Sequence, residues 1–182
     1  GSSFGDSLTG GNAANGMTVG DGLSESFTGN AGNDTIVGGQ GYDIANYATS
    51  TAAVNVVLND SVDASAGAGF GDTDVLRSIE AVGGSIFNDT ITGSNTGAFE
   101  SFAGYEGDDS IDGLGGTDQV DYYYSRASIV VNLSFGTARD DYSSEDTLFK
   151  IEDVRGSRGF DDLLFGGAGD DTVTGCSGTD TA

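Results

Sequence analysis

The chain has 182 residues, including 32 Gly but no Pro or His, and its 29 acidic and 6 basic residues give a net charge of −23. The absence of His excludes a Ser-His-Asp triad and imidazole metal ligands, and the single Cys excludes a zinc thiolate cluster. The negative charge disfavours nucleic acid and anionic lipid, and no apolar run approaches the ~20 residues of a membrane helix. We therefore expect no nucleic-acid partner and no membrane insertion. So many carboxylates instead favour a hard cation such as Ca²⁺, which takes oxygen ligands.

The N-terminal part of the chain contains the first of three tracts of a nonapeptide repeat. The pattern Gly-x-x-Gly-x-Asp begins at Gly29 and again nine residues later at Gly38. The units GSSFGDSLT (1–9) and GDGLSESFT (20–28) keep the spacing with substitutions, whereas residues 10–19 have no acid in register. Glycines at fixed positions permit positive φ in a tight turn, which leaves three residues of each unit for a short strand.

A strand-and-loop segment separates the first tract from the second. It begins with the alternating run VNVVL (54–58), continues through a loop rich in Gly, Asp and Ser, and ends in DVLRSIE (74–80). The alternation predicts a β-strand with its apolar side chains on one face. The segment recurs as IVVNL (129–133) and DTLFKIE (146–152), at offsets of 129 − 54 = 75 and 146 − 74 = 72 residues. We infer about two and a half copies of one module.

The second and third tracts repeat the tandem pattern, which begins at Gly104 and Gly113 and then at Gly166 and Gly175. Residues 93–103 are longer than one unit and lack an Asp in register. Tandem spacing of this kind is the signature of a solenoid. We divide the chain into repeat tract 1 (1–46), strand/loop insertion 1 (47–83), tract 2 (84–121), insertion 2 (122–156) and tract 3 (157–182), together one elongated solenoid within a larger protein.

These units resemble the RTX family of calcium-binding repeats, whose nonapeptide is Gly-Gly-x-Gly-x-Asp-x-U-x with U a large apolar residue. GGQGYDIAN (38–46) and GYEGDDSID (104–112) carry the likeness, and Ile36, Ile111 and Val120 occupy U positions. The resemblance implies an all-β fold, a parallel β-roll or β-solenoid with two nonapeptides per coil and U residues in the core, here interrupted by short strand-loop insertions. It also implies that several Ca²⁺ ions lie between stacked loops, held by Asp side chains and backbone carbonyls.

The resemblance further implies which acids stack and which residues bind Ca²⁺. We expect Asp6, Glu25 and Asp43 to stack on one side and Asp34 to face the other. We also expect Asp89 to pair with Asp109 and Asp162 with Asp180, while Asp118 is poorly matched and Asp171 lacks an evident neighbour. The expected side-chain ligands are Asp6, Glu25, Asp34, Asp43, Asp74, Asp89, Asp109, Asp118, Asp146, Asp162, Asp171 and Asp180. The expected loop residues of the metal sites are Asn30, Gly32, Gly39, Gly41, Gly107, Gly116, Gly167, Gly169 and Gly178.

Three consecutive tyrosines, Tyr122 to Tyr124, admit two interpretations. They could form a platform on which sugar rings stack. Alternation along a strand would instead send Tyr122 and Tyr124 to the same face, which favours a role in the core or on the sheet surface.

The expected function follows from the coupling of folding to metal binding. Stacked carboxylates repel one another, and few large side chains offset the ~1–2 kcal/mol of backbone entropy per residue. We therefore expect a chain that folds only with Ca²⁺, outside the cell, where modules bind it at ~10⁻⁴–10⁻³ M. The prediction is a non-enzymatic structural module of a secreted or cell-surface bacterial protein, such as an adhesin, surface layer or extracellular filament. Its partners would be calcium ions and either further copies joined end to end or neighbouring domains.

An accessory module of a secreted protease, lipase or polysaccharide epimerase is the alternative. A catalytic domain in the full-length polypeptide would favour this alternative, whereas many further copies of the module would favour the structural role.

Overall fold

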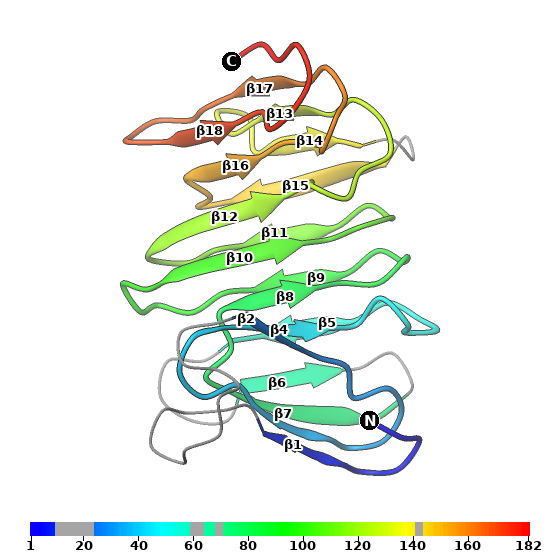
Figure 1. The fold of residues 1–182 in the computed structure, drawn as a ribbon. Helices are drawn as coiled ribbons and strands as arrows, with labels where there is room; N and C mark the ends of the chain where they lie inside the picture. The colour runs from blue at the N-terminus through cyan, green and yellow to red at the C-terminus, as the bar shows by residue number, and fades with distance from the viewer. Residues whose placement is uncertain (10–23, 59–63, 68–70, 141–143) are drawn as a thin grey trace.

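The structure is a computed structural model that describes residues 1–9, 24–58, 64–67, 71–140 and 144–182 (Figure 1). The described residues form 18 β-strands and no helix, so no described segment is a candidate membrane-spanning helix. The chain alternates between two facing sheets and so winds into a coil, as the sequence predicted. The fold is an all-β, mostly parallel β-roll.

The two sheets differ in their number of strands, and we call them the long sheet and the short sheet. In spatial order the long sheet contains β1 (Ser7–Thr9), β3 (Thr35–Val37), β7 (Thr73–Arg77), β6 (Ala64–Gly67), β5 (Asn55–Val57), β9 (Thr90–Thr92), β11 (Ser110–Asp112), β15 (Glu145–Phe149), β14 (Thr137–Arg139), β13 (Val130–Asn132) and β17 (Leu163–Phe165). The short sheet contains β18 (Thr172–Thr174), β16 (Asp153–Arg155), β12 (Thr117–Asp121), β10 (Phe99–Ala103), β8 (Ala81–Gly83), β4 (Tyr42–Asn46) and β2 (Ser24–Phe27).

Each insertion adds an antiparallel meander to the long sheet. Strands β5, β6 and β7 pair antiparallel to one another, as do β13, β14 and β15. Three strands therefore separate β3 from β9 in the long sheet, whereas only β8 separates β4 from β10 in the short sheet. Because strands lie about 4.8 Å apart, each insertion lengthens the long sheet by about 10 Å relative to the short one. The long sheet accordingly extends beyond the short sheet along the roll (Figure 1).

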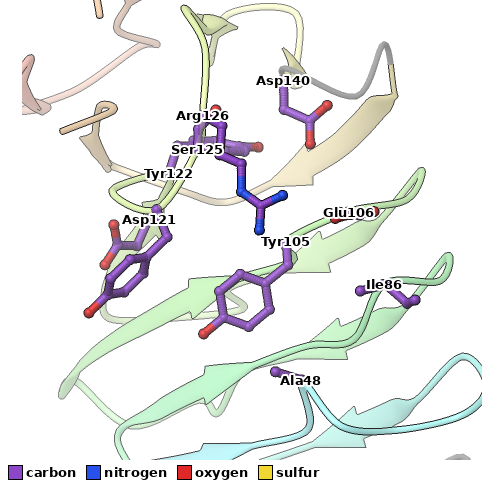
Figure 2. Close-up of a pocket in the computed structure, with 10 residues that line it drawn as sticks. Ala48, Ile86, Tyr105, Glu106, Asp121, Tyr122, Ser125, Arg126 and Asp140 are labelled. Atoms are coloured by element: carbon purple, nitrogen blue, oxygen red, sulfur yellow. The ribbon is translucent and has the colours of Figure 1, made fainter. Parts of the chain in front are cut away.

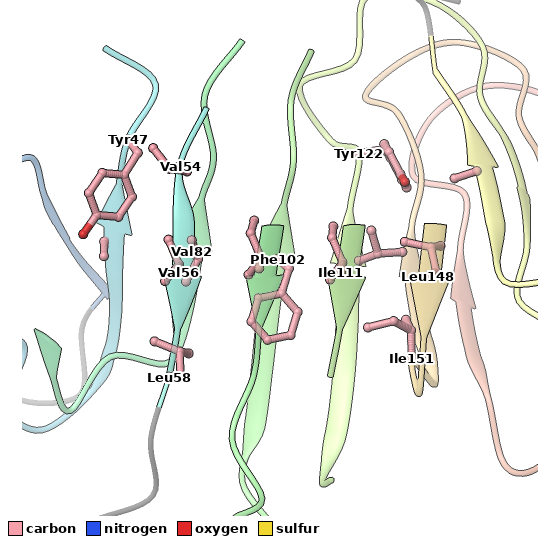
Figure 3. Close-up of a cluster of buried hydrophobic side chains, with 14 of the residues drawn as sticks. Tyr47, Val54, Val56, Leu58, Val82, Phe102, Ile111, Tyr122, Leu148 and Ile151 are labelled. Atoms are coloured by element: carbon pink, nitrogen blue, oxygen red, sulfur yellow. The ribbon is translucent and has the colours of Figure 1, made fainter. Parts of the chain in front are cut away.

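The core fills the space between the sheets with side chains from the U positions and from the insertion strands. Ile36, Ile111 and Val120 are fully buried, as are Val56 and Val131 at the centres of β5 and β13. Figure 3 shows the core side chains following one another along the roll. Full burial of a Val or Ile side chain contributes about 1.5–3 kcal/mol. The predictions that the U residues and the alternating apolar face of each insertion point inward are both confirmed.

Candidate metal centres

The acidic residue that ends each turn into the long sheet stacks on the acid of the next turn. The backbone N–H of Asp6 donates to Oδ1 of Asp34 at 2.6 Å, and that of Asp34 donates to Oδ1 of Asp74 at 2.9 Å. We call this the long-sheet row. It consists of three separate sets: Asp6, Asp34 and Asp74; Asp89, Asp109 and Asp146; and Asp162 and Asp180.

A second row follows the opposite edge, where turns lead into the short sheet. The backbone N–H of Asp43 donates to Oε2 of Glu80 at 2.9 Å, and that of Asp118 donates to Oε2 of Glu152 at 3.0 Å. Strand register continues the contacts through both insertions without a gap. This short-sheet row is Glu25, Asp43, Glu80, Glu100, Asp118, Glu152 and Asp171.

The structure corrects the predicted stacking of Asp6. The sequence placed Asp6 with Glu25 and Asp43, but Asp6 stacks on Asp34 in the long-sheet row, which leaves Glu25 beside Asp43. The prediction counted one half-coil for each unit of nine residues. In the structure Asp6 precedes β1 of the long sheet and Glu25 lies in β2 of the short sheet, so the two acids lie at opposite edges although 25 − 6 = 19 residues, close to two units, separate them. The irregular unit predicted at 10–19 lies outside the described residues.

The other predicted neighbours are placed as follows. The structure brings Asp89 against Asp109, with the N–H of Asp89 donating to Oδ1 of Asp109 at 2.8 Å. Asp162 and Asp180 make the same contact at 3.0 Å. Asp118, expected to be poorly matched, has acids on both sides, and Asp171 lies beside Glu152.

Sequence reasoning missed three members of the short-sheet row, namely Glu80, Glu100 and Glu152. Glu100 belongs to the irregular segment 93–103, where its carboxylate takes the Asp position and accepts the N–H of Ser94 at 2.8 Å. The signal that could have revealed the other two is the Ile-Glu pair that ends both copies of the insertion motif.

Five of the six acids at the ends of the long-sheet sets accept hydrogen bonds from Ser or Tyr side chains. Ser85 donates its hydroxyl to Oδ1 of Asp89 at 2.7 Å, and Tyr122 donates its hydroxyl to Oδ2 of Asp146 at 2.6 Å. These end positions therefore have protein donors for their carboxylates. The equivalent pairs elsewhere are Ser2 with Asp6, Tyr47 with Asp74, and Ser157 with Asp162.

Two aspartates between these ends, and two in the short-sheet row, lack such donors. Asp34 and Asp109 are 1% and 2% exposed, and Oδ2 of each accepts no hydrogen bond. Asp43 and Asp118 in the short-sheet row are fully buried, and neither carboxylate oxygen accepts one. A buried charge without a partner is strongly unfavourable. Because these unpartnered atoms are carboxylate oxygens, they fit a hard cation such as Ca²⁺.

Burial also raises the pKa of these carboxyl groups. Loss of solvent, together with the charge of neighbouring acids, raises the pKa of Asp109 to about 8 and that of Asp118 to about 7. The pKa values of Asp34 and Asp43 are raised by the same burial. Asp109 and Asp118 must therefore either retain a proton near neutral pH or have their charge compensated by a cation.

The first glycine of each turn leaves space for oxygen atoms. A Cβ added at Gly104 would overlap the carboxylate of Asp109. A Cβ added at Gly84 would contact the Asp89 carboxylate and lie 2.7 Å from the carbonyl oxygen of Gly104. A carboxylate oxygen of one turn and a carbonyl oxygen of the next thus border the same small space. No three acidic or thiol side chains converge within the described residues, so an ion at such a space would need backbone carbonyl ligands as well.

All but one of the loop residues expected in the metal sites have a positive φ angle. Gly32 and Gly107 have φ values of 115° and 118°, a region that L side chains rarely adopt. Leu114, at the second position of its turn, has φ 66° where Gly39 in the equivalent turn has φ 110°. Of the other expected residues, Asn30, Gly39, Gly41, Gly116, Gly169 and Gly178 also have positive φ, whereas Gly167 is not among the positive-φ residues.

A pocket of about 240 Å³ lies beside the turns of the long-sheet edge, with Tyr105 and Arg126 in its wall (Figure 2). Tyr122 is 5% exposed and belongs to the core, as expected, but Tyr124 is 71% exposed at the pocket. The predicted alternation is therefore wrong, because β12 ends at Asp121 and the tyrosines lie in the turn that follows.

A parallel β-roll with carboxylates stacked along both edges is the architecture of a cation-binding solenoid. The family model of the RTX calcium-binding nonapeptide repeat matches in four copies, over residues 26–45, 96–122 and 155–182. The chain therefore carries RTX repeats and is a calcium-binding module. RTX repeats are structural modules, and no catalytic family is indicated. No curated protein matches the chain.

Proposed function

We propose that this chain is a calcium-folded structural segment of a secreted or cell-surface bacterial protein, such as an adhesin, a surface layer or an extracellular filament. The observation that carries the proposal is the group of four buried aspartates, Asp34, Asp43, Asp109 and Asp118, whose carboxylates retain oxygens that no protein donor reaches. Bound Ca²⁺ would supply the missing positive charge. These oxygens come together only when the turns stack, so binding stabilises the folded chain selectively.

The magnitude of this stabilisation supports folding outside the cell. At a free Ca²⁺ concentration tenfold above the dissociation constant, each site contributes about 1.4 kcal/mol. Four sites would contribute about 6 kcal/mol, which is comparable to the whole stability of an ordinary domain, about 5–15 kcal/mol. The low Ca²⁺ level of a cytosol would remove this contribution. RTX repeats occur in secreted bacterial proteins, which fits such a switch.

Circular dichroism during a Ca²⁺ titration from a chelated start tests the proposal, with Mg²⁺ as the control ion. We expect a cooperative transition from coil to β-structure near millimolar Ca²⁺ and none with Mg²⁺. Asp109→Asn is expected to raise the Ca²⁺ midpoint, whereas Asp170→Asn, at an exposed position outside both rows, leaves it unchanged. A chain that is fully folded in chelator would contradict the proposal.

A further inference from the structure

We propose that the two insertions form calcium sites of their own, at the short-sheet edge, between a repeat turn and the short turn that ends each insertion. The first site lies between the turn 38–43 and residues 78–80, and the second between the turn 113–118 and residues 150–152. This inference rests on the proposed function, because it assumes that the unpartnered aspartates bind Ca²⁺. It assigns ligands to residues that lie outside the matched RTX segments.

The first observation is a space lined by oxygen atoms at Gly38. A Cβ added there would clash with the carbonyl oxygen of Ser78 and lie 2.7 Å from Oδ2 of Asp43. The repeat turns have the same pair of atoms at Gly84, where the carbonyl oxygen of Gly104 and the carboxylate of Asp89 are the neighbours. Ser78 thus places its carbonyl oxygen where a repeat turn places that of its first glycine.

The second insertion reproduces this arrangement with a different residue. A Cβ added at Gly113 would clash with the carbonyl oxygen of Lys150 and lie 2.6 Å from Oδ2 of Asp118. Ser78 and Lys150 have φ values of 50° and 48°, a conformation that is unfavourable for both residues. Because two unrelated side chains adopt the same rare backbone, the position of the carbonyl oxygen is the feature that the two turns share.

The third observation is the pair of acids that complete the sites. Glu80 and Glu152 accept the N–H of Asp43 and Asp118, the role that an Asp of the next repeat turn has elsewhere. The insertion turns are short, since only residues 78–80 separate β7 from β8.

The unpartnered oxygens point to a ligand at these positions independently of the acidic row. Asp43 and Asp118 are fully buried, and both oxygens of each carboxylate lack a hydrogen-bond donor. Among the described residues, the glycines Gly29 and Gly104, which precede the insertions at the long-sheet edge, have no such oxygen pair. There, the three atoms nearest to a Cβ at Gly29 all belong to Asp34, and those nearest to a Cβ at Gly104 all belong to Asp109.

The test counts the Ca²⁺ ions bound per chain by equilibrium dialysis with Ca²⁺ alone, using the whole chain. Glu80→Gln and Glu152→Gln keep an oxygen that can accept the aspartate N–H but remove the charge. We expect each to lower the number of bound ions by one at a Ca²⁺ concentration that saturates the other sites. Glu145→Gln is the matched control, because this exposed Glu lies in insertion 2 outside both rows, paired with Arg139.

Unchanged ion counts in both variants would overturn the inference while leaving the proposed function intact. A wild-type chain that binds no Ca²⁺ would instead refute both. Crystals of the wild-type chain grown with Tb³⁺ give a second measurement that does not require a variant to fold. Anomalous peaks beside the carbonyl oxygens of Ser78 and Lys150 are expected. Peaks at the repeat turns alone would overturn the inference.

Discussion

The acidic rows along the two edges of the roll differ in continuity. The short-sheet row contains seven acids in unbroken succession, whereas the insertions divide the long-sheet row into sets of three, three and two. The cause is topological, because each meander enters the long sheet between two turns, while the short sheet receives one ordinary strand at the same level. An insertion can therefore interrupt one edge and leave the other continuous.

The difference shows how the carboxylates at the ends of a row are compensated by hydrogen-bond donors. In the long-sheet set Asp89, Asp109 and Asp146, a Ser hydroxyl reaches the first acid and a Tyr hydroxyl the last, so only Asp109 retains an unpartnered oxygen. Each set of three thus has one unpartnered carboxylate oxygen, on its central acid. In the short-sheet row the acids Asp43 and Asp118 beside the insertion turns have no such hydroxyl, which leaves a bound cation or a proton to compensate their charge.

A change from about pH 8 to about pH 5 is expected to have the largest effect, because it acts on both rows. The pKa values of about 8 for Asp109 and about 7 for Asp118 exceed the ~3.9 of an unfolded Asp. Protonation therefore stabilises the metal-free fold fully below about pH 4, and this stabilisation is lost as the pH rises through about 7 to 8. The chelated chain should be more folded at pH 5 than at pH 8.

The same protons compete with Ca²⁺. The Ca²⁺ affinity of a site should fall about tenfold for each pH unit below the pKa of its carboxyl group, so the site at Asp109 should weaken before the site at Asp118. Ca²⁺ titrations followed by circular dichroism at several pH values measure this. A midpoint independent of pH would show that the buried carboxylates are not the ligands.

Gly104→Ala is expected to have the next largest effect, about 3 kcal/mol of destabilisation, because its Cβ would overlap the carboxylate of Asp109. Gly113→Ala should be similarly harmful at the other edge, where Asp118 lies in the way. The matched control is Gly115→Ala, whose Cβ would meet nothing closer than 3.9 Å. Thermal unfolding in saturating Ca²⁺ gives the comparison. Equal melting temperatures for Gly104→Ala and Gly115→Ala would contradict the packing of carboxylate against glycine.

Tyr122→Phe tests the contribution of the tyrosine hydroxyl that donates to the last acid of a long-sheet set. The variant leaves Oδ2 of buried Asp146 without its donor, which should destabilise the Ca²⁺-loaded fold by about 2 kcal/mol. Tyr124→Phe is the control, because Tyr124 is 71% exposed, and it should unfold like the wild type. If the two variants unfold at the same denaturant concentration, the hydrogen bond from the Tyr122 hydroxyl to Asp146 does not stabilise the fold.

Local sequence signals predicted the roll itself. The tandem glycines and U residues such as Ile36 depend only on neighbours within one unit, so their positions in turn and core could be predicted. Strand β6, with sequence ASAG, was predicted as loop because small residues carry little β-propensity. Its strand conformation comes from antiparallel pairing with β5 and β7, which no local pattern encodes.

The candidate sites were predictable to the extent that they follow the nine-residue register. Asp109 could be identified from its own unit, but its unpartnered oxygen could not, because the donors to the adjacent acids come from Ser85, at a variable position of its unit, and from Tyr122 in insertion 2. Glu80 was missed for a related reason. It reaches the row from a turn shorter than a repeat unit, so spacing alone gave no indication of it.

Leu114→Gly should have the smallest effect, and it tests whether the short-sheet edge is limited by backbone strain as well as by charge. Leu114 has φ 66° at the turn position where Gly39, in the equivalent turn, has φ 110°. Glycine adopts this region without the penalty of about 1 kcal/mol that a Cβ brings. Because Leu114→Ala loses the same side chain but keeps the Cβ, the Gly variant should be about 1 kcal/mol more stable than the Ala variant. Chemical denaturation in saturating Ca²⁺ measures the difference, and an Ala variant at least as stable as the Gly variant would show that this turn stores no strain.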